Sequence, residues 1–103
     1  MKPGLLLWDV YEVTSKNSAL HGVMLRGRIR KLGIDRNCNV LVDNAQDLDN
    51  TVRFWVLNDA DKDIVFEYLK SIIDDVKIDK VLSRCPNPVL SKLKVNIESR
   101  YSM

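Results

Sequence analysis

A cluster of cationic residues is the part of this chain most capable of chemistry. The stretch ALHGVMLRGRIRKLG, residues 19–33, carries Arg26, Arg28, Arg30 and Lys31. A planar guanidinium can bind two phosphoryl oxygens at once, and backbone N–H groups at the start of a helix favour an anion. Three interpretations fit the stretch: a phosphate-binding turn that leads into a helix, a basic strand, or an amphipathic helix without chemistry.

The other residues capable of chemistry lack a diagnostic spacing. His21 is the one histidine of the sequence, and a loop histidine without an identified partner favours a structural role. Cys38 and Cys85 do not have the spacing of metal ligands, so we expect no metal and no other cofactor. A Cys–His nucleophile requires the fold to bring His21 beside one of them. Two cysteines without a secretory context indicate a reduced, cytoplasmic chain.

Length and charge exclude several classes of protein. The chain has 103 residues, which predicts a single domain over 1–103 with one two-layer core. Its formal net charge is +2, from 16 Lys and Arg against 14 Asp and Glu, which is too small to indicate nucleic-acid binding by itself. The sequence contains no apolar run long enough to span a membrane. We expect a monomer.

The hydrophobic pattern predicts the elements that position these residues. Residues 5–13, 39–44 and 51–57 are rich in β-branched and aromatic residues and predict strands. The last two form an antiparallel hairpin, because the polar residues between them favour a turn. Residues 58–73 predict a helix capped by Asn58 or Asp59, with an apolar face formed by Ile64, Val65, Tyr68, Leu69, Ile72 and Ile73. Two further strands are expected near residues 76–83 and 90–99, separated by the turn RCPNP.

The basic stretch decides between two topologies. As a helix it places Leu25, Ile29 and Leu32 on one face and ends at Gly33, a common helix-stopping residue. As a strand it alternates well from Val23 onward, and the fold would be a meander with one helix. We favour the helix, because two helices can then cover one sheet face. The prediction is an α+β, ferredoxin-like βαββαβ sandwich with an antiparallel sheet.

Short segments along this plan carry a resemblance to a known family. They are YEV at 11–13, GVMLR at 22–26, VDN at 42–44, KID at 77–79, and the later LSKLKV and SRY. In this order the chain resembles the acylphosphatase family, which has the βαββαβ fold. The interval from Arg26 to Asn44 is eighteen residues, which matches the interval between the catalytic Arg and Asn of that family.

The resemblance implies hydrolysis of an acyl phosphate to a carboxylate and inorganic phosphate, with these small molecules as the binding partners. By this resemblance Arg26 would hold the phosphate and Asn44 would orient the attacking water. It also assigns the final part of the phosphate cradle to His21, Gly22, Val23, Met24 and Leu25. Without a metal, positioning and charge stabilisation would carry the catalysis.

Simpler interpretations of the same residues stay open. Arg26 could belong to a solvated basic face, and Asn44 precedes a turn, where Asn commonly forms local hydrogen bonds. The family's loop is Gly-x-Val-Gln-Gly-Val, whereas this chain has SKNSALHGV. The alternative is therefore a catalytically inactive domain of the same fold that binds protein or RNA. The sequence lacks the aromatic-rich pattern of an RNA-recognition strand, so nucleic acid is the less favoured partner.

Overall fold

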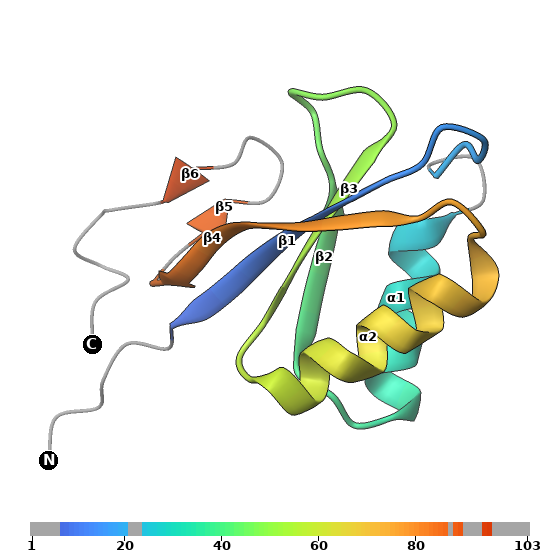
Figure 1. Ribbon diagram of the computed structural model, residues 1–103. Coiled ribbons are helices and arrows are strands. Elements are labelled where there is room, and N and C mark those ends of the chain that lie inside the picture. The colour runs from blue at the N-terminus through green and yellow to red at the C-terminus, as the bar shows by residue number, and fades with distance from the viewer. Residues whose placement is uncertain (1–6, 21–23, 87, 90–93, 96–103) are drawn as a thin grey trace, which may run out of the picture.

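The computed structural model describes residues 7–20, 24–86, 88–89 and 94–95 (Figure 1). The first six elements follow in the order strand, helix, strand, strand, helix, strand, and a short hairpin comes after them. In chain order they are β1 Trp8–Thr14, α1 Leu25–Asp35, β2 Val40–Asn44, β3 Thr51–Val56, α2 Asp59–Ile72, β4 Lys77–Cys85, β5 Pro88–Val89 and β6 Lys94–Val95.

Four strands form one antiparallel sheet in the order β2-β3-β1-β4. Residues of β1 and β3 alternate between its faces, so Tyr11, Val13, Val52 and Phe54 point toward the helices and are buried. Leu25 and Ile29 of α1 and Val65 and Leu69 of α2 belong to the same core cluster. Both helices therefore cover one face of the sheet (Figure 1). The prediction of an α+β chain with an antiparallel sheet and two helices is confirmed.

The basic stretch forms a helix, so the strand interpretation of it is wrong. Leu25, Ile29 and Gly33 of α1 are buried at i, i+4 and i+8. The prediction that α1 ends at Gly33 is also wrong, because the helix continues to Asp35. A Cβ at Gly33 would lie 2.7 Å from Cγ1 of Val40. Gly33 therefore lets α1 approach β2 closely, and Asn37, with a φ of 50°, takes the left-handed conformation beyond the helix end.

The second helix begins as predicted. The side chain of Asn58 accepts a hydrogen bond of 2.9 Å from the N–H of Asp61. The buried face differs in part from the prediction: Val65, Leu69 and Ile73 are buried, but Ile72 is 37 % exposed. Asp61, in the first turn of α2, is also buried, and its carboxylate accepts a hydrogen bond from the N–H of Asn39. The buried face of α2 therefore follows positions i, i+4, i+8 and i+12, counted from Asp61.

The ends of the chain differ from the prediction. The strand expected at 76–83 is β4, Lys77–Cys85. Of the strand expected at 90–99, the described part is β6, Lys94–Val95, which pairs with β5 in a separate two-stranded sheet. The other residues of that segment, and residues 5 and 6 of the first predicted strand, lie outside the described residues.

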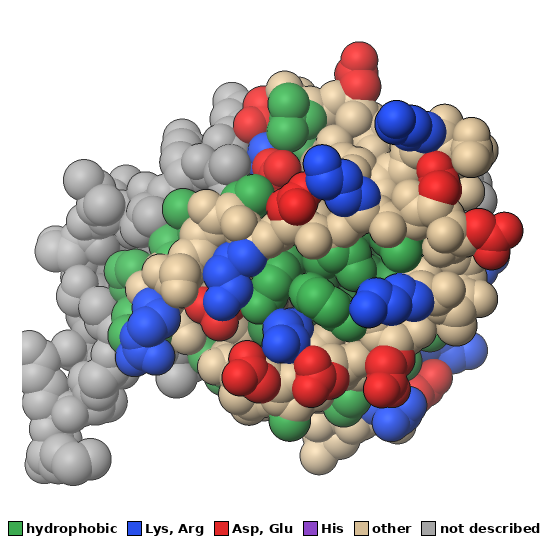
Figure 2. Space-filling view, in the orientation of Figure 1, with side chains coloured by type: hydrophobic (Ala, Val, Ile, Leu, Met, Phe, Trp, Pro, Cys, Tyr) green, Lys and Arg blue, Asp and Glu red, His purple; other side chains and the backbone are tan. Residues whose placement is uncertain are grey.

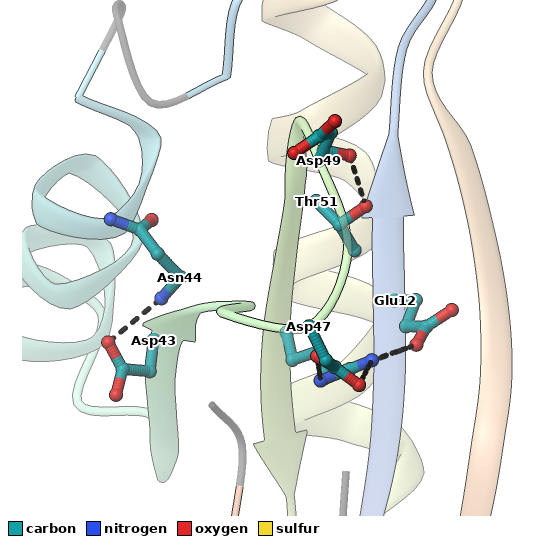
Figure 3. A network of polar contacts seen from close by, with 7 residues as sticks. Glu12, Asp43, Asn44, Asp47, Asp49 and Thr51 are labelled. Atoms are coloured by element: carbon teal, nitrogen blue, oxygen red, sulfur yellow. Dashed lines mark hydrogen bonds and ion pairs between the residues drawn. The ribbon is translucent and has the colours of Figure 1, made fainter. Parts of the chain in front are cut away.

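The sheet face away from the helices carries a buried ion cluster and a tryptophan pair. Trp8 and Trp55 stack with ring centroids 4.7 Å apart. Beside them Arg53 is completely buried and contacts two carboxylates, Glu12 at 2.7 Å and Asp47 at 2.6 Å. Figure 3 shows Glu12 of β1 and Asp47 of the loop after β2 converging on this point. The Arg53 guanidinium thus fixes the 45–50 loop to the sheet.

Candidate functional site

The fold brings Arg26 and Asn44 to one hollow. Arg26 lies in the first turn of α1, and Asn44 is the last residue of β2. They lie on the same side of the sheet edge because α1 packs along β2. The hollow has a volume of about 170 Å³ and is lined by Met24, Leu25, Arg26, Gly27, Arg30 and Asn44. The two residues that the resemblance singles out therefore share a cavity, together with a second guanidinium.

Asn44 lines this hollow, and among the described residues its amide oxygen lacks a hydrogen-bond partner. This Oδ1 atom is buried. Figure 3 shows the Asn44 amide extending from the end of β2 toward α1. A buried oxygen without a partner costs free energy unless water or a ligand donates to it. The amide is thus suited to hold a small hydrogen-bond donor.

Arg26 is paired with a carboxylate of the chain itself. Its Nη1 lies 3.2 Å from Oδ1 of Asp43, and the same oxygen accepts a 2.8 Å bond from the backbone N–H of Asn44. One anionic oxygen is therefore bound by a guanidinium and a backbone donor at the edge of the hollow. The side chains of Arg26 and Asp43 are 45 % and 43 % exposed, and an ion pair so exposed contributes at most about 1 kcal/mol. Another anion can displace it at small cost.

The start of α1 is an unusual helix terminus. Met24 precedes the helix in the left-handed conformation, with φ 58° and ψ 42°, and provides no side-chain cap. The side chain of Leu25 is buried in the core, and its N–H donates to the carbonyl of Leu20 at 3.1 Å. In the described part of the predicted cradle, Leu25 therefore contributes backbone shape and not a donor. The other predicted cradle residues, His21, Gly22 and Val23, lie outside the described residues.

Two polar side chains from distant elements hold the loop that leads into α1. Asn50 donates to the carbonyls of Ser15 and Ser18, at 2.9 and 2.8 Å, and accepts from the N–H of Leu20 at 2.7 Å. From the other side, the carboxylate of Asp75 accepts from the Ser15 hydroxyl at 2.6 Å. The loop is therefore fixed at both of its flanks before it reaches the hollow.

The anchoring carboxylate also binds the loop backbone. Asp75 accepts from the N–H groups of Lys16 and Asn17, at 2.8 and 3.0 Å. The hydrogen bond from the Ser15 hydroxyl, reinforced by these two N–H groups, lowers the pKa of Asp75 below its ordinary value. Asp75 is thus held as the anion that the loop requires.

The cysteines are buried free thiols. Cys38 is 8 % exposed, and burial, with a smaller contribution from the charge of Asp61, raises the pKa of its thiol. Burial also raises the pKa of Cys85. A raised pKa leaves little thiolate at neutral pH, which argues against either thiol as a nucleophile.

Residues 7–20, 24–86, 88–89 and 94–95 contain no group of three His, Cys, Asp or Glu side chains that could hold a metal ion. Neither of the helices described there combines the length and the apolar character needed to cross a membrane.

Sequence reasoning missed the partners of the site. Asp43 was part of the VDN segment, and its position beside Asn44 was the one signal available. Asn50 and Asp75 gave no signal, because their contacts join residues 30 to 60 positions apart in the chain. Such contacts depend on the completed fold.

The comparisons add nothing to this geometry: no family model, no curated protein and no solved structure matches the chain.

Proposed function

We propose that this chain is an acylphosphatase-like hydrolase on a ferredoxin-like βαββαβ sandwich. The observation that carries the proposal is one hollow lined by Arg26, Arg30 and Asn44, in which the buried Oδ1 of Asn44 has no hydrogen-bond partner among the described residues. The order of the first six elements and the packing of both helices on one sheet face support the fold. The reaction would convert an acyl phosphate and water into a carboxylate and inorganic phosphate.

Binding begins with an exchange of anions at Arg26. A phosphoryl group replaces the Asp43 carboxylate, and the guanidinium binds two of its oxygens. The backbone N–H of Asn44, which now donates to Asp43, is free to donate to the same phosphoryl group. Arg30 lines the hollow on the next turn of α1 and adds a second positive charge. The substrate therefore uses the donors that bind the internal carboxylate.

The chemical step requires a positioned water. The Asn44 Oδ1 accepts a hydrogen bond from this water and aims its oxygen at phosphorus. The new bond forms between water oxygen and phosphorus, and the bond from phosphorus to the acyl oxygen breaks with its electron pair. The leaving group is a stabilised carboxylate and needs no proton. The proton of the water passes to the released phosphate or to solvent.

The test is the hydrolysis of benzoyl phosphate by the purified chain. We expect Arg26→Ala and Asn44→Ala each to lower kcat/KM by about 100-fold to 1,000-fold, since each removes a group that acts on the transition state. Arg36→Ala and Asn39→Ala are matched controls, because both side chains are exposed and neither lines the hollow. Unchanged thermal unfolding shows that the variants are folded. An inactive parent chain, or full activity in both variants, refutes the proposal.

The Arg26–Asp43 pair favours a second candidate, a catalytically inactive domain of the same fold that binds a protein. A carboxylate that satisfies Arg26 from within the chain would suit such a domain. The variant Asp43→Asn separates the two candidates. For an enzyme it lowers KM for benzoyl phosphate, because the competing anion is gone. For an inactive domain, both the parent chain and the variant fail to hydrolyse benzoyl phosphate.

A further inference from the structure

A second hollow lies on the outer face of α1, beside the first. It has a volume of about 360 Å³ and is lined by Met24, Gly27, Arg28 and Lys31. Gly27 leaves its floor open, since a Cβ at this position would meet no atom within 4 Å. Met24 at its side is 72 % exposed. The hollow thus has apolar walls and two cations at its rim.

The cations at this rim have no internal counterion. Arg28 and Lys31 are exposed, and within the described part of the chain neither forms an ion pair. They stand three residues apart on a helix, where like charges repel each other. Their spacing therefore reduces the stability of α1, and a bound anion would reverse this loss.

From these observations we propose that the outer face of α1 is a docking site for a short acidic peptide segment with an apolar side chain. The apolar side chain fills the hollow above Gly27 and packs against Met24. Carboxylates on both sides of it pair with Arg28 and Lys31. The two hollows share Met24 and Gly27, but Arg28 and Lys31 line only the second one, so reversal of these two charges tests the docking site apart from the hydrolase.

The short length of α1 and the acidic residues of α2 argue against a long polyanion as the occupant. The exposed side of α2 carries Asp59, Asp63 and Glu67, and Figure 2 shows acidic side chains in a row on the face where α2 lies. The helix α1 has 11 residues and is therefore only about 16 Å long. A nucleic acid or a membrane surface would reach past α1, so most of it would lie beyond the two cations. The sequence of α1 also lacks aromatic residues on which bases stack.

The test is a selection from a random peptide library displayed on phage, with the parent chain as bait. We expect the enriched peptides to combine acidic residues with a central apolar residue. One enriched peptide is then labelled with fluorescein and titrated by anisotropy. We expect Arg28→Glu/Lys31→Glu to raise its Kd at least about 100-fold. The control Lys16→Glu/Lys70→Glu changes the net charge equally at exposed positions elsewhere and should leave Kd within about twofold.

A third variant tests the hollow without a change of charge. Gly27→Leu has space for its side chain and improves helix propensity, so it should keep or raise thermal stability while raising Kd at least about tenfold. The proposal is overturned if no acidic peptides are enriched, or if the Arg28 and Lys31 reversal leaves Kd unchanged. It is also overturned if single-stranded DNA or vesicles of anionic lipid compete as well as unlabelled peptide does.

Discussion

The two helices cover the same sheet face, but they differ in their caps and in the charges of their terminal turns. The helix α2 has an Asn58 cap, acidic residues Asp59 and Asp61 in its first turn, and Lys70 in its last. Each of these features complements the helix dipole or satisfies a free N–H. The helix α1 starts at a left-handed Met24 without a side-chain cap and has no acidic residue in its first turn and no basic residue in its last.

This difference indicates that the two helices have different roles. The charges and the cap of α2 stabilise it as a helix, and its buried stripe closes the core. In α1 the cations gather at the positive end of the helix dipole, which costs stability and attracts anions. Local sequence choices that conflict with the fold are typical of functional sites. The hollow lined by Arg26 and Arg30 and the hollow lined by Arg28 and Lys31 both lie along α1, which agrees with this distinction.

The largest effect we expect comes from exchanging glycine for alanine within α1. Gly33→Ala should lower the free energy of unfolding by about 1–3 kcal/mol, because its Cβ would lie 2.7 Å from Val40 Cγ1. Gly27→Ala should raise it by up to about 1 kcal/mol, because the position is open and alanine favours the helix. Urea unfolding of both variants measures the difference. Equal effects at the two positions would contradict the close packing of α1 on β2.

The next prediction compares how the first residues of the two helices affect stability. Asn58→Ala removes the bond to the Asp61 N–H and should cost about 1 kcal/mol. Met24→Gly should instead stabilise the fold by about 1 kcal/mol, because glycine adopts a φ of 58° without strain. Chemical denaturation of the two variants beside the parent chain gives both values. If Met24→Gly destabilises, then its side chain supports the fold and the helix start is not strained.

Charge reversal in the first turn gives a smaller effect of opposite sign in the two helices. Arg28→Glu places a negative charge near the start of α1 and should raise the free energy of unfolding by about 0.3–1 kcal/mol. Asp59→Lys does the reverse in α2 and should lower it by a similar amount. Both effects should shrink when the denaturation is repeated in 1 M NaCl, since salt screens exposed charges. Shifts of the same sign would show that the dipole does not govern these positions.

The smallest effect we expect is on the pH dependence of stability. The pKa of Asp75 is lowered in the fold, mainly by the Ser15 hydroxyl, so its stabilising contribution is complete above the unfolded pKa, near 4. It is lost as the pH falls through the folded value. Asp75→Asn should therefore unfold more easily at pH 7 and show a flatter decline between pH 4 and pH 2. Parallel curves for variant and parent chain would mean that Asp75 does not hold the loop leading into α1.

Much of the fold follows from local pattern. The alternation of Thr51–Val56 and the cap and stripe of α2 predict their elements, because these signals act within a few residues. Gly33 misled the prediction, because its sequence context resembles a helix stop while its role is close packing against a distant strand. The exposed Ile72 was misplaced for a similar reason. The exact orientation of a helix is set by the sheet below it, which no local pattern contains.

The candidate site could be predicted only in part. The interval from Arg26 to Asn44 led to two residues that line one hollow. The Asp43 carboxylate between them was not expected as the partner of Arg26, because side-chain direction at a sheet edge follows from tertiary packing. The anchoring of the preceding loop by Asn50 and Asp75 was invisible for the same reason. Residue types and spacing thus indicate a site, but its counterions come from the fold.

The tryptophan pair has a practical consequence for following this protein in solution. Both tryptophans of the chain, Trp8 and Trp55, stack on the sheet face away from the helices and join neighbouring strands β1 and β3. Their fluorescence should change when this pair of strands separates, and a ligand on α1 should leave it unaltered. Indole fluorescence would therefore report the integrity of the sheet alone, and the anisotropy of a labelled peptide would report occupancy of α1, so the two could be followed separately in one sample.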